Sequence, residues 1–165
     1  MGIGDDQVGL PGRTRPLVVL LSGPNLDLLG RRQPHIYGRQ TLAEHVERAA
    51  VVAASFGLTV EHLQSASEHE LVKAVHDARG HAACLVVNAG ALTHYSWSLA
   101  DALASFDGVA VELHLSNPVA REPWRHVSVL APVVAGTVAG FGGLGYELAV
   151  EAAAKLAGFA RSGEA

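Results

Sequence analysis

Short apolar runs alternate with helix-length segments along most of the chain, and this alternation constrains the fold more than any other feature. The run at 17–21 lies between Pro16 and Gly23 and has no polar residue, as expected for a strand buried on both faces. Capping-box sequences, Thr41–Glu44 and Ser67–Glu70, predict where two helices begin. We expect strands at 17–21, 58–63, 83–87, 109–115 and 133–139, and helices at 41–56, 67–80, through Asp101 to Phe106, and at 142–156.

Strands that alternate with helices at this spacing indicate a parallel sheet covered by helices on both faces. Right-handed crossovers leave few arrangements of such a sheet. We therefore predict an α/β fold of the flavodoxin-like kind, a three-layer α/β/α sandwich whose five-stranded parallel sheet has the order 2-1-3-4-5.

The composition fits one domain that binds a small molecule. The 165 residues are 49% hydrophobic, enough for one substantial core. Twelve basic and 16 acidic residues give a net charge of -4 without a long basic run, so we do not expect a nucleic-acid partner. We predict a flexible arm at 1–15, a catalytic domain at 16–158 and a flexible tail at 159–165.

One cysteine, Cys84, lies inside an apolar run, so an intramolecular disulfide is excluded and a buried thiol in a reducing compartment is expected. The chain shows neither a signal-type segment nor an apolar run of the roughly 18 residues that a membrane helix needs. We predict a cytoplasmic protein that does not contact a membrane.

Ligands of such sheets bind beyond the carboxyl ends of the strands, where the strand order reverses. The first and third predicted strands lead there to Asn25 and Asn88. In the fourth, alternation places Glu112, His114 and Ser116 on one face, where the carboxylate can orient the imidazole and raise its pKa. His114 is therefore a candidate proton donor, with a purely structural histidine as the alternative.

The loop at 23–38 follows the first strand and carries Arg32 and Tyr37 between glycines. A tyrosine accepts a proton at neutral pH only if its phenolate is favoured, and a desolvated guanidinium nearby supplies that preference. The alternative is a surface loop with solvated arginines and a packed tyrosine ring.

Other motifs give weaker predictions. The sequence G-F-G-G-L-G at 140–145 matches a dinucleotide fingerprint but comes too late in the chain, so we interpret it as close packing of a strand on a helix. Lys73 and Lys155 are expected on helices away from the strand ends, which disfavours imine chemistry. Most histidines are expected at the surface, and His94 with His114 lacks a third metal ligand, so we predict neither a metal nor a cofactor.

Four blocks together resemble the type II 3-dehydroquinate dehydratases. They are G-P-N-L-x-x-L-G-x-R-x-P-x-x-Y-G at 23–38, N-A-G-A-L-T-H at 88–94, E-L-H-L-S-N at 112–117 and A-R-E-P-W-R-H at 120–126. The resemblance covers nearly all of 17–156 and implies a flavodoxin-like fold. It also implies cofactor-free dehydration of 3-dehydroquinate to 3-dehydroshikimate, by anti elimination through an enolate.

The resemblance also implies roles for individual residues. Tyr37 would be the proton acceptor, His114 the proton donor oriented by Glu112, and Arg32 the group that lowers the pKa of Tyr37 and stabilises the transition state. Asn25 would position the water that stabilises the enolate oxygen. The implied substrate-binding residues are Asn88, His94 and Arg125 at the ring hydroxyls, Leu115 and Ser116 at the carboxylate, Arg121 on the lid side, and Asp101, which reaches a neighbouring subunit's site.

The family's assembly implies a homo-oligomer, a dodecamer built as a tetramer of trimers. The same reaction serves aromatic amino acid biosynthesis through the shikimate pathway and quinate breakdown, and the sequence leaves both open. Two other functions also remain open: a non-catalytic flavodoxin-like module that binds a polyol acid, and a nucleotide-binding protein that uses 140–145.

Overall fold

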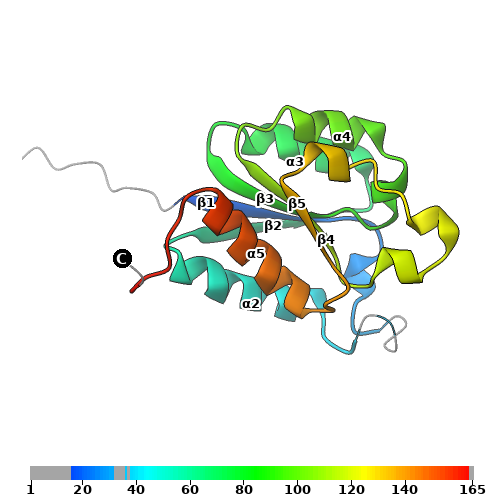
Figure 1. Cartoon of the computed structure of the whole chain (residues 1–165), viewed down its shortest axis with the longest axis horizontal. Coiled ribbons are helices and arrows are strands. Elements are labelled where there is room, and N and C mark those ends of the chain that lie inside the picture. Colours follow the sequence, from blue (N-terminus) through cyan, green and yellow to red (C-terminus); the bar gives the residue numbers. More distant parts are fainter. Residues whose placement is uncertain (1–15, 32–35, 37, 164–165) are drawn as a thin grey trace, which may run out of the picture.

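The computed structural model describes residues 16–31, 36 and 38–163, and in that part of the chain five parallel strands form one sheet (Figure 1). The strand order is β2-β1-β3-β4-β5, as predicted, and this confirms the flavodoxin-like α/β fold. The strands are β1 (Leu17–Ser22), β2 (Thr59–Gln64), β3 (Ala82–Asn88), β4 (Val109–His114) and β5 (Gly136–Ala139).

Helices cover both faces of this sheet (Figure 1). The helices α2 (Leu42–Ser55) and α5 (Leu144–Leu156) pack on one face, and α3 (Glu68–Ala78) and α4 (Trp97–Ala104) on the other. Alternate β1 residues enter the two cores: Val18 and Leu20 belong to the α2–α5 side, Val19 and Leu21 to the α3–α4 side. This double burial explains why the central strands are continuously apolar.

The first helix start was predicted correctly, and the second only in part. The Thr41 hydroxyl accepts from the Glu44 backbone N–H, and the Glu44 carboxylate accepts from the Thr41 N–H, which is a complete capping box. Ser67 caps α3 by accepting from the Glu70 N–H at 3.4 Å. The Glu70 carboxylate instead accepts the hydroxyl hydrogen of Ser65.

Strand and helix ends differ from prediction near the carboxyl-terminal third. The predicted strand at 133–139 begins only at Gly136, because Pro132 lacks an N–H and stands in a 3-10 turn over Ala131–Val133. β4 ends at His114, which pairs with the last residue of β5. The final helix begins at Leu144 rather than Gly142, whose φ of 56° is left-handed.

The connection at 116–131 contains the 3-10 turns Pro118–Ala120 and Pro123–Arg125. A proline at the start of each turn fixes the backbone φ angle there, and its missing N–H costs no hydrogen bond because the first residue of a turn has no partner for that group. These turns arch beyond the end of β4 and form the part of the molecule farthest from the carboxyl terminus in Figure 1.

The predicted arm at 1–15 lies outside the described residues. The predicted tail is described as far as Gly163, where Phe159 packs against the α2–α5 core and the Ser162 N–H donates to the Ser55 carbonyl at 2.8 Å. The domain boundary at 158 stays a prediction. None of the helices in the described ranges is long and apolar enough to cross a membrane.

Candidate active site

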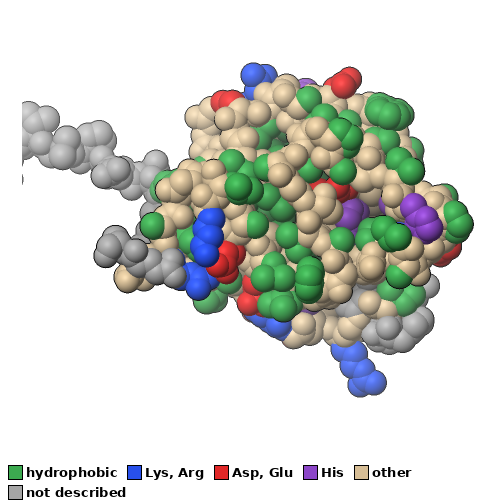
Figure 2. Space-filling model, viewed as in Figure 1, with side chains coloured by type: hydrophobic (Ala, Val, Ile, Leu, Met, Phe, Trp, Pro, Cys, Tyr) green, Lys and Arg blue, Asp and Glu red, His purple; other side chains and the backbone are tan. Residues whose placement is uncertain are grey.

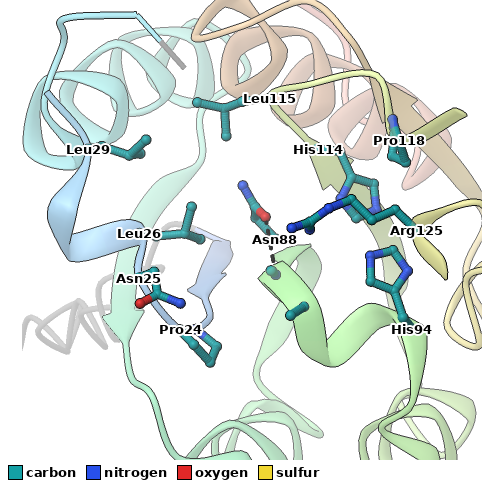
Figure 3. A pocket seen from close by; sticks show the side chains of 12 residues that line it. Pro24, Asn25, Leu26, Leu29, Asn88, His94, His114, Leu115, Pro118 and Arg125 are labelled. Carbon is teal, nitrogen blue, oxygen red and sulfur yellow. Dashed lines mark hydrogen bonds between the residues drawn. The ribbon is translucent and has the colours of Figure 1, made fainter. Parts of the chain in front are cut away.

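A pocket lies beyond the carboxyl ends of β1, β3 and β4, where the strand order reverses (Figure 3). The space-filling view is hollowed near the 116–131 connection, with histidine and acidic atoms visible in the hollow (Figure 2). Polar residues from four separate segments line the pocket together with apolar side chains. They are Pro24, Asn25, Leu26, Leu29, Asn88, Gly90, Ala91, His94, His114, Leu115, Pro118 and Arg125.

Close packing of two loops brings Asn25 and Asn88 to this pocket. A Cβ on Gly23 would lie 2.4 Å from the Ala89 carbonyl oxygen, and one on Gly90 would lie 3.1 Å from the Pro24 carbonyl oxygen. Only glycine allows such an approach of two backbones. Asn25 itself has φ 67°, a left-handed conformation that asparagine tolerates better than most residues.

Asn88 presents an unsatisfied donor to the pocket. Its side chain is buried, and Oδ1 accepts from the Gly90 N–H at 3.4 Å. Nδ2 is buried and makes no hydrogen bond of normal geometry within the described part of the chain, although the amide lies close enough to the Tyr146 phenol to oppose the rise that burial causes in that group's pKa. Figure 3 shows Nδ2 directed into the pocket. A buried amide donor without a partner is costly, so this position favours a ligand with an acceptor oxygen.

His114 and Glu112 form a pair at the end of β4, as their alternation along the strand predicted. Nε2 of His114 lies 2.9 Å from Oε1 of Glu112, and the carboxylate is fully buried. His114 is 9% exposed and lines the pocket, and its Nδ1 is the ring nitrogen that does not face Glu112. The imidazole is therefore held by one nitrogen while the other is available to a ligand.

Three hydroxyl groups also donate to Glu112. Oε1 accepts from Thr93 and, at 2.7 Å, from Ser128, and Oε2 accepts from Thr137 at 3.2 Å. Burial alone would raise the pKa of Glu112, but the hydrogen bonds from His114, Thr93 and Ser128 outweigh it and hold the pKa below its ordinary value. Glu112 is consequently an anion at neutral pH.

His94 and Arg125 form the wall of the pocket opposite β1 (Figure 3). Nδ1 of His94 donates to the Val127 carbonyl at 2.7 Å, so Nε2 is the ring nitrogen left for other partners. The Trp124 ring contacts both residues: it is nearly perpendicular to the His94 ring, with centroids 5.3 Å apart, and the Arg125 guanidinium lies 4.0 Å from its centre. Arg125 also donates to Glu122 at 2.7 Å.

The remaining predicted site residues lie elsewhere. Leu115 lines the pocket, but Ser116 does not, and its hydroxyl accepts from Arg121 Nη1 at 3.4 Å. Asp101 is exposed on α4, outside this pocket. Arg32 and Tyr37 lie outside the described residues.

Sequence reasoning missed Thr93, Ser128 and Thr137. Thr93 stands in a block that carried the resemblance, yet nothing in the order of residues shows that its hydroxyl points at β4. Ser128 and Thr137 meet Glu112 only because the 116–131 connection folds back and β5 pairs in register, with Glu112 beside Thr137. Long-range register of this kind leaves no local pattern in the sequence.

The glycine-rich segment packs against the core, as predicted, and not against the pocket. A Cβ on Gly145 would lie 2.9 Å from Leu113 Cδ1, and one on Gly143 would lie 2.1 Å from His45 Cε1. His45 is an exception to the expectation that most histidines lie at the surface: it is 1% exposed because α2 turns it toward α5. Among the described residues, no three histidine, cysteine or acidic side chains are grouped to hold a metal ion.

The sequence and the structure are both similar to those of known proteins. Residues 16–154 match the family model described as dehydroquinase class II. A 3-dehydroquinate dehydratase of Hyphomonas neptunium is 48% identical over 145 residues, which are 88% of this chain and 97% of that protein. A catabolic 3-dehydroquinase 2 of Aspergillus terreus is 43% identical over 140 residues, 85% of this chain and 95% of that one. The crystal structure of a type II dehydroquinase from Propionibacterium acnes superposes with a TM-score of 0.78 at 38% identity, covering 86% of this chain and 99% of that one.

Proposed function

The chain belongs to the class II dehydroquinase family, and we propose that it catalyses the dehydration of 3-dehydroquinate to 3-dehydroshikimate. The single structural observation that carries the proposal is the hydrogen bond between Glu112 and His114, whose ring lines the pocket beside Asn88. Loss of water from a β-hydroxy ketone needs a base for the α-proton, an acid for the departing hydroxyl and stabilisation of the enolate between them.

His114 is the acid in this scheme. Its Nε2 is held by the Glu112 anion, so Nδ1 delivers a proton to the hydroxyl as the carbon–oxygen bond breaks. The Glu112 carboxylate at 2.9 Å fixes the orientation of the ring, and the ring returns to neutral when the proton leaves with water.

Tyr37 is the proposed base and Arg32 its proposed activator, both outside the described residues. The phenolate removes the α-proton, the electron pair forms the enolate, and the enolate expels the hydroxyl when the ketone reforms. Asn25, at the pocket wall, is proposed to position a water molecule against the enolate oxygen. The enolate step explains why this reaction requires no imine.

The proposed binding groups surround the pocket. Asn88 Nδ2, His94 Nε2 and Arg125 are proposed to bind ring hydroxyls, and their positions at the pocket wall support this. The backbone N–H groups of Leu115 and Ser116 are proposed to bind the substrate carboxylate, with Arg121 nearby through its contact with Ser116.

We further propose a cytoplasmic homo-oligomer, a tetramer of trimers, that serves the shikimate pathway. Exposed aromatic side chains support an interface on the α4 side: Tyr95 is 60% exposed and Trp97 70%, in the same region as Asp101. The buried Cys84 thiol, whose pKa burial raises to about 11, suits a reducing compartment. Quinate breakdown is the alternative role, since a relative carries the name of a catabolic enzyme.

The direct test is to mix the purified chain with 3-dehydroquinate and a chelator and to follow the ultraviolet absorbance of the conjugated enone. We expect turnover without added metal or cofactor, and we expect it to survive borohydride treatment in the presence of substrate. The matched control is His114→Asn, which should fold but lose most of its turnover. No enone from the wild-type chain would reject the proposed function.

Replacing Tyr37 with phenylalanine tests the base. The change removes one oxygen atom, so turnover should fall by about three orders of magnitude or more, which is the upper part of the range for a general base. Substrate binding, measured by calorimetry, should change little. A Tyr37→Phe chain with near-normal turnover would assign the base to another residue.

A further inference from the structure

We propose that Ser128 and Thr93 are positioning residues for the reaction: their hydroxyl groups hold the Glu112 carboxylate as the fixed acceptor behind His114. The inference deepens the proposed function and rests on it, because it concerns the group that orients the proposed acid. Thr93 and Ser128 do not line the pocket that contains Asn88; they line an adjoining cavity with Glu112, and their hydroxyl groups donate to its carboxylate, so the proposed role acts through Glu112.

The surrounding backbone sets the direction of the Ser128 hydroxyl. Its oxygen accepts from the Leu130 N–H at 3.1 Å and from the Ala131 N–H at 2.9 Å. A hydroxyl has two acceptor positions and one hydrogen, so these two bonds leave only the hydrogen for Glu112 Oε1, 2.7 Å away. The Ser128 hydroxyl therefore donates to Glu112, and it could not rotate to accept a hydrogen bond there without losing those to the two backbone N–H groups.

Thr93 reaches the same oxygen from another element. It is completely buried at the end of the 3-10 turn Gly90–His94, and its hydroxyl donates to Glu112 Oε1. The Val129 N–H donates to the Thr93 carbonyl at 2.9 Å, which holds the chain around Ser128 beside this turn. Two hydroxyls and the His114 ring thus converge on one carboxylate oxygen, while Thr137 at the exposed edge strand contacts the other.

The convergence of donors on Glu112 matters because the carboxylate accepts hydrogen bonds without donating any only while it is ionised. A protonated carboxyl group has a hydrogen to donate, and it would compete with the His114 ring for the role of donor. Among the residues that the structure describes, the titratable and charged groups that border the same cavity as Glu112 are His114 on β4, His94 on the 3-10 turn, and Arg125 and His126 on the connection. None of them is a second carboxylate.

A purely structural role is the competing explanation, since Ser128 also accepts from the N–H of Ala131, the first residue of the 3-10 turn Ala131–Val133. Ser96 provides a matched control in the same fold. It is buried, its oxygen accepts from the Leu99 N–H at 3.1 Å, and its hydroxyl donates to a different carboxylate, Glu68, at 2.5 Å. Ser96→Ala therefore removes bonds of the same two kinds, one from a backbone N–H and one to a carboxylate, without involving Glu112.

The experiment measures the ionisation of Glu112 directly, by NMR titration of its side-chain carboxyl carbon, assigned with Glu112→Gln. In Ser128→Ala and in Thr93→Val, the midpoint should rise by about one pH unit, since each change removes a hydrogen bond to a charged group. The acidic limb of the kcat/KM profile should move in the same direction. Ser128→Thr, which keeps the hydroxyl, and Ser96→Ala should both keep the wild-type midpoint.

An unchanged midpoint in both Ser128→Ala and Thr93→Val would overturn the proposal, and so would an equal rise in Ser96→Ala. The carboxyl titration needs no turnover, so it separates this proposal from the proposed function. If the wild-type chain does not dehydrate 3-dehydroquinate, the function fails, whereas the titration still decides whether these hydroxyls hold Glu112 ionised.

Discussion

His45 shows how a single buried side chain couples folding to pH. Its ring stacks on Tyr146 with centroids 5.5 Å apart, and neither ring nitrogen has a hydrogen-bond partner in the described part of the chain. Burial, followed by the charge of Arg48, lowers the pKa of His45. The folded protein therefore favours the neutral ring, because a charged imidazolium buried without a hydrogen-bond partner would cost still more free energy.

We expect His45 to make the folded state less stable as pH falls. The unfolded chain takes up a proton near pH 6.5, whereas the folded chain takes it up only at lower pH, so folding is penalised from about pH 6.5 downward. His45→Leu should flatten the loss of unfolding free energy between about pH 7 and pH 5, measured by urea denaturation. Part of the slope should remain, since burial also lowers the pKa of His62.

His62→Gln is the comparison for this measurement. His62 lies on the edge strand β2 and keeps a partner, with Nε2 3.0 Å from the Ser22 hydroxyl, so its replacement should flatten the slope less. A His45→Leu chain with the wild-type slope would show that the ring takes up protons normally in the folded state.

At the scale of elements, the glycine-rich segment explains how α5 docks on the sheet. Gly143 lies against the His45 ring of α2 and Gly145 against Leu113 of β4, so the segment lets one helix approach two neighbours at once. The sequence predicted close packing here but not the partner, because His45 is separated from Gly143 by almost a hundred residues.

Gly143→Ala should destabilise the fold by about 1–3 kcal/mol, the usual cost of overpacking, because the new Cβ would stand 2.1 Å from His45 Cε1. Gly136→Ala is the matched control: no atom lies within 4 Å of a Cβ there, so the change should stay within about 0.5 kcal/mol. Chemical denaturation of both variants gives the comparison.

A double variant identifies the cause. If the clash with the imidazole is responsible, Gly143→Ala should cost less free energy in a His45→Ala background than in the wild-type chain. An equal cost in both backgrounds would instead point to the backbone at the start of α5.

Element boundaries show where sequence reasoning works and where it stops. The capping box at Thr41 and the apolar run at 17–21 are local signals, and the structure has a helix and a strand there. β5 was placed too early because Val133 and Val134 favour a strand, whereas Pro132 and the absence of a pairing partner override that preference. The strand propensity of a residue is a local property, whereas strand pairing depends on the neighbouring strand of the sheet.

At the scale of the whole molecule, the strand order decides which residues meet. Residues more than sixty positions apart, Asn25 and Asn88, share a pocket because β1 and β3 are neighbours with their carboxyl ends at the same edge. The topology and the Glu112–His114 pair could be predicted from periodicity and alternation. The hydroxyls of Ser128 and Thr137 could not, since their approach depends on how a connection folds over that edge.

Assembly supplies the last prediction. Asp101 is exposed on α4 and does not line its own chain's pocket, and we propose that it completes the site of a neighbouring subunit. Asp101→Ala and His114→Asn should each abolish most turnover alone. In mixed trimers, the Asp101→Ala chain still supplies His114 and the His114→Asn chain still supplies Asp101. A site formed by these two residues from neighbouring chains is intact.

Co-refolding the two inactive variants at equal concentration should then restore roughly a quarter of wild-type turnover, because random mixing in a ring gives an intact combination at about one site in four. Separately folded variants mixed without exchange are the control and should stay inactive. If the co-refolded mixture shows only the average of the two variants, Asp101 does not act across a subunit boundary. Sedimentation of the same samples shows whether the chains assemble, so failure to assemble is distinguished from failure to complement.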